Sequence, residues 1–530
     1  MTKNIENEIA LKGLKLEMTD NEIDHIKIKN IGTKSHIELE SKNASQDLAI
    51  SGEITRATEA EQAIVDAQEI INNYLDAEIK ALQIKVYGID INETTGDVIR
   101  THDAIGKTVS APNGVSAIVS GFDTLYPFSD SRHVKVSTDG VIKEQLEHDY
   151  AAFDGEIMTR IPQFYYKDIR YGGHRYCTIS KDYVTGYSKA WQDKEYGLIS
   201  SMGASLVSGE YRSRVDEAPK TITSYTNFIT AFYAKGDGKW SMYDANMMHN
   251  LFLLTCIEVG STNHKGSYGR GINSGMPYSS SANYLLIADT VNGNTVTLGN
   301  LGQSFYVGMI VQIGSSYTNN TVAKDRKILS IDTTTDLVLT LDGDAFSAVI
   351  GNAAASWGQS VPEAQFNIIG DGSGYIEQWG SVNRSHVCYR GIWDLWGNIW
   401  QFLAGFMRKD GQMYGCCDKL GYNITDPSLS TKWTDLGLNI QAANGYQRLR
   451  EAIKIDGGSV DVPIEWGSVA SSETFYSAYL YSFSAPYQGV RVLRVGGSWY
   501  NGGDVSLVCS SGILTPSAAY IFIGARLIRY

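Results

Sequence analysis

The spacing of apolar residues changes along the chain and divides it into segments. Residues 1–50 mix charged and β-branched residues without a clear period, and we interpret them as a small N-terminal attachment module. From about Glu53 to Leu82 the chain has no Gly or Pro. Five apolar residues recur there at steps of four and three: Ala60, Ile64, Ala67, Ile71 and Tyr74. This spacing predicts a helix with a narrow apolar stripe.

A narrow stripe with charged flanks is not buried by a single exposed helix, so we predict that residues 51–86 form a coiled coil. The coiled coil would make the chain a homotrimer. The heptad breaks at Glu78, and Ile79, Leu82 and Val86 resume it one residue out of phase. The alternative is a solvated helix that packs on its own domain.

After Val86, aromatic and β-branched runs punctuated by Gly and Asp predict short strands. We assign a β-rich connector to residues 87–153 and the main domain to residues 154–530. One amphipathic core helix is predicted between Trp240 and Glu258. Ser241 and Asp244 stand at capping-box positions, and three apolar residues share one face: Met247, Leu251 and Leu254.

A cassette of about residues 283–350 interrupts the main domain. An Asn292-Gly293 hairpin signal is followed by the alternating or apolar runs VGMIVQIG, KILSID and LVLTLDG. Flanking segments rich in Ser, Gly and Asn are typical of linkers around a module inserted in a surface loop. We therefore predict a small all-β insertion.

Length and charge exclude several classes of function. A chain of 530 residues is longer than one hydrophobic core normally organises, so we expect two to four folding units. The formal charge of -13 disfavours nucleic-acid binding, which needs clustered Lys and Arg. The N-terminus lacks a signal-peptide core, and no run of about 18 apolar residues predicts membrane insertion. We expect synthesis in a reducing cytosol, since the six cysteines are scattered.

Motifs that would indicate catalysis, a cofactor or a metal are missing from the sequence. H-E-x-x-H, G-x-S-x-G, the phosphate-binding G-x-x-x-x-G-K-[ST] and paired His ligands do not occur. We therefore predict that the chain is not an enzyme and binds no cofactor and no metal. A glycan hydrolase stays open as a less favoured alternative, because any two of the 58 acidic residues could form its carboxylate pair.

Two segments carry a family resemblance: GIWDLWGNIWQF (391–402) and the run from GGSWYNGG to IGARLI (496–528). Together they resemble the formylglycine-generating-enzyme type of C-type lectin fold, with its D-x-x-GN-x-W-E-W, GGSW and terminal GFR patterns. The matching residues are Asp394, Gly397, Asn398, Trp400, Gly496, Gly497, Ser498, Trp499, Gly524 and Arg526. Gln401, Phe402 and Ala525 depart from the pattern, which weakens any catalytic inference.

The resemblance implies an α+β fold class, with an N-terminal coiled-coil helix followed by a C-type lectin-like domain that contains the β insertion. Asp394, Gly397, Asn398, Trp400, Gly496, Gly497, Trp499 and Arg526 would be its structural scaffold. Arg526 lies in an apolar strand and needs a buried partner, for which Asp394 is the candidate. Oxidation of a peptide cysteine needs a cysteine pair, and only Cys509 lies near the C-terminal core. The calcium-binding motifs E-P-N and W-N-D of sugar-binding lectins do not occur.

The stretch between the two glycine-rich ends suits neither a core nor a solvated loop. It resembles the variable region of proteins diversified by retroelements, in which randomised adenines change scattered positions ahead of a fixed end. The resemblance implies a variable receptor-binding surface at Tyr500, Asn501, Asp504, Ser506, Val508, Ser510, Ile513, Leu514, Thr515, Ser517, Tyr520 and Phe522. The alternative is that these are ordinary loop and strand residues of a fixed protein. On such a surface the aromatic residues would be the anchors.

These observations predict a receptor-binding protein of a phage or prophage tail fibre. Its partners would be a bacterial surface receptor, protein or glycan, and other tail proteins through the N-terminus. The protein would reside in the virion after synthesis in the bacterial cytoplasm without a signal peptide. The alternative of another class is a structural tail or baseplate protein without receptor contact.

Overall fold

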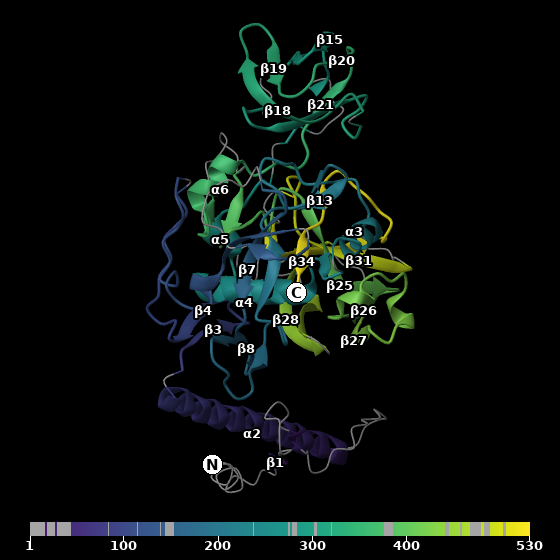
Figure 1. Cartoon of the computed structure of the whole chain (residues 1–530). Helices are drawn as coiled ribbons and strands as arrows, with labels where there is room; N and C mark the ends of the chain where they lie inside the picture. The colour runs from purple at the N-terminus through teal and green to yellow at the C-terminus, as the bar shows by residue number, and fades with distance from the viewer. Residues whose placement is uncertain are drawn as a thin grey trace.

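Strands predominate in the computed structural model (Figure 1). It describes residues 16–17, 27–28, 44–82, 84–113, 115–137, 139–143, 153–236, 238–273, 276–277, 284–301, 305–319, 321–375, 385–439, 445–455, 458–466, 479–481, 488–501 and 505–530. The fold class predicted from the sequence, α+β with an N-terminal coiled coil, is therefore wrong: the chain is mostly β. None of the described helices combines the length and apolarity that a membrane crossing requires.

Helix α2 (Ala44–Leu82) shows why the coiled-coil prediction fails. The helix contacts its own domain: the Asn72 amide donates to the Tyr171 hydroxyl (2.8 Å), and Asp76 lies 3.0 Å from His102. Ala67 is buried, but Ile64 of the predicted stripe is 43% exposed. The second half of the helix therefore contacts its own domain, and the homotrimer stays a prediction.

The predicted connector at 87–153 is not a separate unit, because its strands complete two sheets of the main body. The first sheet has the order β10 (Ser188–Lys189), β8 (Tyr165–Tyr171), β9 (His174–Ser180), β3 (Val86–Asn92), β4 (Val98–His102). The second has the order β14 (Trp240–Met242), β34 (Leu527–Arg529), β11 (Tyr196–Ser200), β7 (Glu156–Pro162), β5 (Arg132–Val136), β6 (Ile142–Lys143). Strand β34 brings the C-terminus into the second sheet, where it pairs with β11 and β14.

The largest sheet carries most of the C-terminal third of the chain. Its order is β27 (Thr434–Asn439), β26 (Gln412–Gly415), β25 (Trp400–Lys409), β31 (Val490–Gly496), β32 (Ser506–Leu514), β30 (Tyr479–Tyr481), β28 (Gly445–Ile455), β29 (Gly458–Trp466). Strand β33 (Ile523–Gly524) adds to β25 in parallel. Shorter elements complete the body: β12 (Ser205–Val207), β13 (Glu210–Arg212), α3 (Tyr225–Tyr233), α5 (His264–Tyr268), α6 (Glu363–Ile369), β22 (Gly374–Tyr375), β23 (Val387–Tyr389) and β24 (Ile392–Trp393). Strands β1 (Leu16–Glu17) and β2 (Lys27–Ile28) pair with each other in a separate two-stranded sheet.

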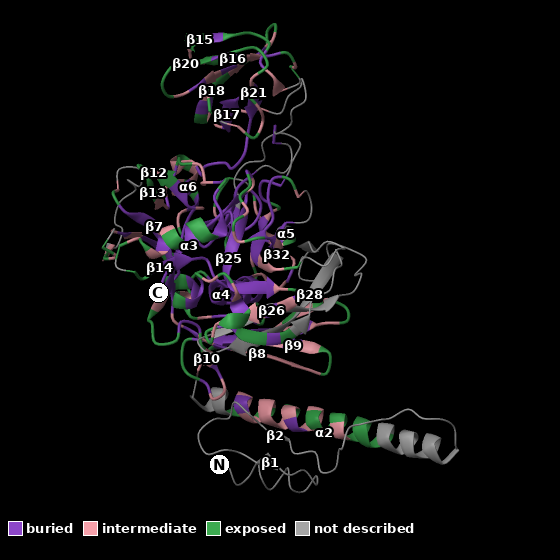
Figure 2. Ribbon diagram, turned by 90° about the vertical axis from the view of Figure 1, so that its right-hand side faces the viewer, coloured by how far each residue is buried: buried purple, intermediate pink, exposed green. Residues whose placement is uncertain are grey.

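Helix α4 (Ala245–Val259) lies at the centre of the body (Figure 2). The Asp244 carboxylate caps it by accepting a hydrogen bond from the Met247 amide at 2.8 Å, while Ser241 belongs to strand β14. The helix is not amphipathic, because every residue from Ala245 to Glu258 is buried. One apolar cluster joins it to β3, β8 and β9 on one side and to β25 and β32 on the other. A helix covered by sheets on both sides needs apolar residues all around.

The inserted β module is present close to the predicted bounds and projects from the body at the top of Figure 1. One sheet has the order β16 (Thr295–Leu298), β19 (Leu337–Leu341), β18 (Ala323–Asp332), β17 (Ile310–Gly314), β21 (Ala353–Ala355); β15 (Thr290–Gly293) pairs with β20 (Phe346–Ala348). Its apolar core is continuous with Ile399, Trp499 and Ile521 of the main body. The module therefore shares a core with the chain end.

Candidate binding surface

A buried frame brings together the two segments that carry the family resemblance. We call residues 394–400 and 496–499 the frame; all of them are buried. The Gly397 amide donates to the Gly496 carbonyl (3.1 Å), and the Trp499 amide donates to the Asn398 carbonyl (3.0 Å). The side chains of Trp396, Trp400 and Trp499 are among the largest fully buried ones. The predicted scaffold residues thus lie together.

The two glycines at the end of β31 are required by close packing. Gly496 has φ +95° and Gly497 has φ +76°, a region that L side chains rarely adopt. A Cβ atom on Gly496 would lie 2.9 Å from the Leu395 carbonyl oxygen, and one on Gly497 would lie 2.7 Å from Val505 Cγ1. Both positions exclude larger residues.

Asn398 ties the β insertion to the frame. Its backbone amide donates to the carbonyl of Ile272, which precedes the insertion, at 2.7 Å. Its side chain accepts from the Gln359 amide and donates to the Gln359 carbonyl, both at 2.8 Å, and Gln359 follows the insertion. Asn398 Nδ2 also donates to Asp394 Oδ2, which lies 2.7 Å from His386 Nδ1. One residue therefore fastens both linkers, one through its backbone and the other through its side chain.

Arg526 does not pair with the carboxylate of Asp394, which corrects the sequence-based prediction. Its Nε donates to Gln401 Oε1 (2.8 Å), and its Nη atoms donate to the carbonyls of Ser200, Trp393 and Asp394. Burial lowers the pKa of Arg526 to about 10, and the charge of Asp394 acts in the opposite direction. Gln401, one of the departures from the family pattern, is thus the direct side-chain partner.

Four residues of the predicted variable surface are buried in strand β32. Ser506, Val508, Ser510 and Leu514 are buried at 0%, 2%, 8% and 7% exposure, and Ile513 is half-buried. The strand pairs with β31 on one side and with β30 on the other. A strand between two neighbours, with both faces covered, cannot offer these side chains to a receptor. Their assignment to a binding surface is therefore wrong for this structure.

The remaining predicted positions lie on two loops that we call the terminal loops: Tyr500–Asn501 and Thr515–Phe522, yellow in Figure 1. Tyr500 is 61% exposed and Tyr520 is 44% exposed. Thr515 and Ser517 are exposed and Phe522 is half-buried. Asp504 lies outside the described residues. Both loops leave the frame beside residues 398–400, because the Trp400 amide donates to the Phe522 carbonyl at 2.9 Å.

Asn501 has an internal role in its turn. Its Oδ1 accepts hydrogen bonds from the Ser498 amide (3.0 Å) and from the Ser498 hydroxyl (2.8 Å), while its own amide donates to the Ser498 carbonyl (2.9 Å). This ring of contacts directs the neighbouring Tyr500 outward. Asn501 therefore shapes the loop more than it offers a contact surface.

The second terminal loop is fastened along its length. The Pro516 carbonyl accepts from the amide and the hydroxyl of Thr226, the residue after Tyr225 at the start of α3. The Ile222 amide donates to the Tyr520 carbonyl at 3.0 Å, and the Ala518 amide closes a turn on the Thr515 carbonyl. An exposed loop with this many backbone contacts holds one shape.

A column of rings and one guanidinium supports Tyr520. The Tyr520 ring stacks on Phe522 with centroids 5.4 Å apart and planes at 18°. Beneath it the Arg494 guanidinium carbon lies 5.4 Å from the Phe522 centroid and 4.5 Å from the Trp400 centroid. Cation–π contacts of this kind strengthen when they are desolvated, and Arg494 is 7% exposed. Arg494 was not among the predicted site residues, because its pairing with Phe402 across two strands has no local signal in the sequence.

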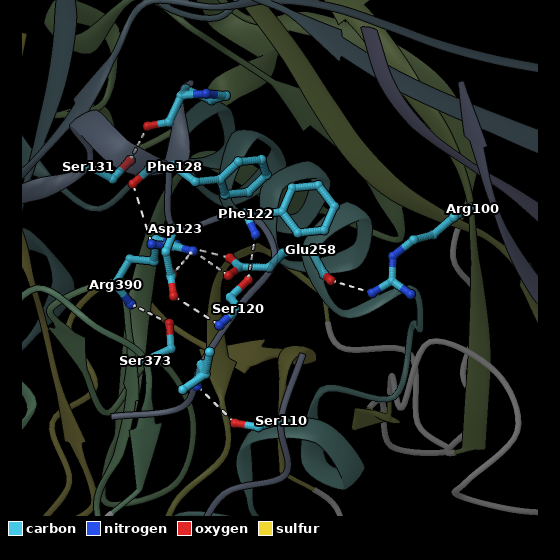
Figure 3. A network of polar contacts seen from close by, with 12 residues as sticks. Arg100, Ser110, Ser120, Phe122, Asp123, Phe128, Ser131, Glu258, Ser373 and Arg390 are labelled. Atoms are coloured by element: carbon cyan, nitrogen blue, oxygen red, sulfur yellow. Dashed lines mark hydrogen bonds and ion pairs between the residues drawn. The ribbon is translucent and has the colours of Figure 1, made fainter. Parts of the chain in front are cut away.

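A second cluster of charges lies at the end of α4 (Figure 3). Arg390 Nε donates to Glu258 Oε2 at 3.0 Å, and its Nη2 contacts both Glu258 Oε1 and Asp123 Oδ1. Arg100 donates to the Glu258 carbonyl, and Ser373 accepts from the Arg390 amide. Burial lowers the pKa of Arg390, but the charge of Glu258, its hydrogen bond to Arg390 and the charges of neighbouring tyrosines together raise that pKa above its ordinary value.

The cluster of Arg390, Glu258 and Asp123 stabilises the fold and does not form a catalytic site. Glu258 and Asp123 contact one nitrogen of Arg390, which is close enough for the carboxylate pair of a glycan hydrolase. However, Glu258 is fully buried and its carboxylate is occupied by Arg390, so no substrate could reach it. Within the described part of the chain, no group of three or more His, Cys, Asp or Glu side chains could hold a metal ion.

Comparisons with known proteins add no family to this description. No protein-family model matches the chain, and no curated protein matches it.

Proposed function

We propose that the chain is a recognition protein of a phage or prophage tail that binds a bacterial surface receptor through the terminal loops. The observation that carries the proposal is the exposure of Tyr500 and Tyr520 beside a fully buried frame. Aromatic side chains give a large contact area for little loss of rotamer entropy, so exposed tyrosines are favoured contact residues. Other tail proteins would bind through the N-terminus.

The likeness of residues 496–528 to retroelement-diversified proteins supports the proposal, with the changeable positions restricted to the terminal loops. Of the twelve predicted variable positions, Tyr500, Thr515, Ser517 and Tyr520 are exposed and can change without repacking the core. Phe522, beneath Tyr520, is a supporting residue. Diversification, if it acts on this chain, would act on the terminal loops and spare β32.

Attachment of the labelled full chain to a panel of bacterial strains tests the proposal. The double variant Tyr500→Ala, Tyr520→Ala should lose attachment to the strains that the unchanged protein binds, because both anchors are removed, while its melting temperature changes little. Tyr183→Ala is the matched control: Tyr183 is 59% exposed between β9 and β10, outside the terminal loops. Equal attachment of the double variant and the control would contradict the proposal.

A structural tail or baseplate role is the second candidate. The unchanged protein, the double variant and Tyr183→Ala would then all bind the strains equally, or none of them would bind. Removal of the terminal loop tyrosines would instead impair particle assembly. Comparing particle yield with attachment for the same variants separates the two functions.

A further inference from the structure

The terminal loops offer a preformed and uncharged surface. Tyr520 is held from below by Phe522 and Arg494, and the loop is fastened through the carbonyls of Pro516 and Tyr520. The described loop residues, YN at 500–501 and TPSAAYIF at 515–522, include no acidic or basic side chain. Besides aromatic rings, the loops carry hydroxyl groups, and Thr515 Oγ1 lies 3.2 Å from Ser517 Oγ. Little ordering entropy is lost when a rigid surface binds.

We propose that the exposed ring of Tyr520 is a stacking platform for a neutral saccharide and that binding needs no calcium ion. The inference rests on the proposed recognition function and names its ligand class. The face of an aromatic ring is electron-rich and attracts weakly positive C–H groups, which a pyranose presents on one side. The sugar hydroxyls can then exchange hydrogen bonds with the hydroxyls of Thr515 and Ser517.

The net charge of the chain and the small exposed apolar area of the terminal loops favour a neutral saccharide over an anionic polymer or a protein partner. The formal charge of -13 disfavours anionic polymers, because the approach of two negative surfaces is repulsive. The described terminal loops expose two large apolar side chains, Tyr500 and Tyr520, and Ile222 beside Tyr520 is 42% exposed. A stable protein interface needs roughly 800 Å² from each partner around an apolar centre, which three side chains do not supply. A single sugar ring needs only one aromatic face.

Binding of the full chain to an array of neutral and anionic oligosaccharides tests the inference. We expect binding to at least one neutral saccharide that is unchanged by EDTA. Tyr520→Ala should weaken it by about tenfold or more, the usual cost of truncating a contact hot spot. Tyr520→Phe keeps the ring and should retain binding, and Tyr183→Ala should bind as the unchanged protein does. Loss of binding in EDTA, no neutral ligand, or full binding by Tyr520→Ala would each overturn the inference.

Pretreated cells separate this inference from the proposed function. Periodate cleaves sugar rings, whereas protease removes protein receptors. If periodate abolishes attachment and protease does not, the saccharide is supported. If protease abolishes attachment and periodate does not, the saccharide inference fails while receptor recognition stands. If Tyr520→Ala and the double variant both attach normally to untreated cells, both ideas fail. A melting curve for Tyr520→Ala controls for folding.

Discussion

Strand β32 and the loop that follows it differ in what surrounds them, although one chain segment runs through both. In β32, Ser510 is 8% exposed and pairs with Val495 of β31 and Leu480 of β30. Ten residues later, Tyr520 is 44% exposed at the end of a fastened loop. Small hydroxyl side chains fit a crowded sheet interior, and a large ring fits the loop. The comparison teaches that freedom to vary is set by position in the fold rather than by residue type.

The largest loss of stability should come from a substitution in the frame beneath the terminal loops. Trp499 is 2% exposed and packs in the cluster that joins the chain end to the β insertion, while its neighbour Tyr500 is 61% exposed. Trp499→Ala should destabilise the protein by about 3–5 kcal/mol, as large-to-small changes in a core do. Tyr500→Ala should stay within about 0.5 kcal/mol, as surface changes do. Denaturant unfolding of both variants measures the difference, and similar values would remove the distinction between frame and loop.

The pH should act on the buried body and not on the described residues of the terminal loops, which carry no acidic or basic side chain. Burial raises the pKa of Asp244 to about 6, although hydrogen bonds from Met247, Tyr530 and Tyr422 oppose the shift. Because the folded-state pKa lies above the ordinary value of 3.8, the stabilisation from protonated Asp244 is complete below pH 3.8 and is lost as the pH rises through about 6.

Asp244→Asn should remove this dependence. The shift corresponds to about 3 kcal/mol, so the free energy of unfolding of the unchanged protein should fall by that order relative to the variant between pH 3.5 and 7. Denaturant unfolding at a series of pH values checks this. A difference between the two proteins that stays constant with pH would show that Asp244 titrates normally.

Local signals in the sequence predicted local structure well. Helix α4 was recognisable because an apolar run is read from neighbouring residues, although its N-cap is Asp244 and the predicted capping box with Ser241 does not form. The β insertion was recognisable for the same reason, through its hairpin signal and short strands. Seven of the eight scaffold residues, which the resemblance supplied, lie in the frame, and the eighth, Arg526, contacts the frame at the Asp394 carbonyl.

Long-range packing could not be read from the chain. The pairing of Tyr87 with Ile179 places the supposed connector inside a sheet, and no local pattern encodes that partner. The stripe on α2 has the same spacing whether it faces another helix or its own domain. Arg526 needed buried acceptors, but backbone carbonyls of distant residues supply most of them. In residues 500–522, serines that are buried and serines that are exposed look alike, because Ser fits both environments.

The sharpest comparison places one residue type in both regions. Ser510→Tyr inserts a ring into β32, where both faces are covered, and should cost about 1–3 kcal/mol through overpacking. Ser517→Tyr places the same ring on the exposed terminal loop and should cost within about 0.5 kcal/mol. Thermal and denaturant unfolding of the two single variants give the values directly. If Ser510→Tyr were tolerated as well as Ser517→Tyr, β32 could repack freely. The four residues of that strand would then return to the set of changeable positions, and the boundary between frame and loop would have to move.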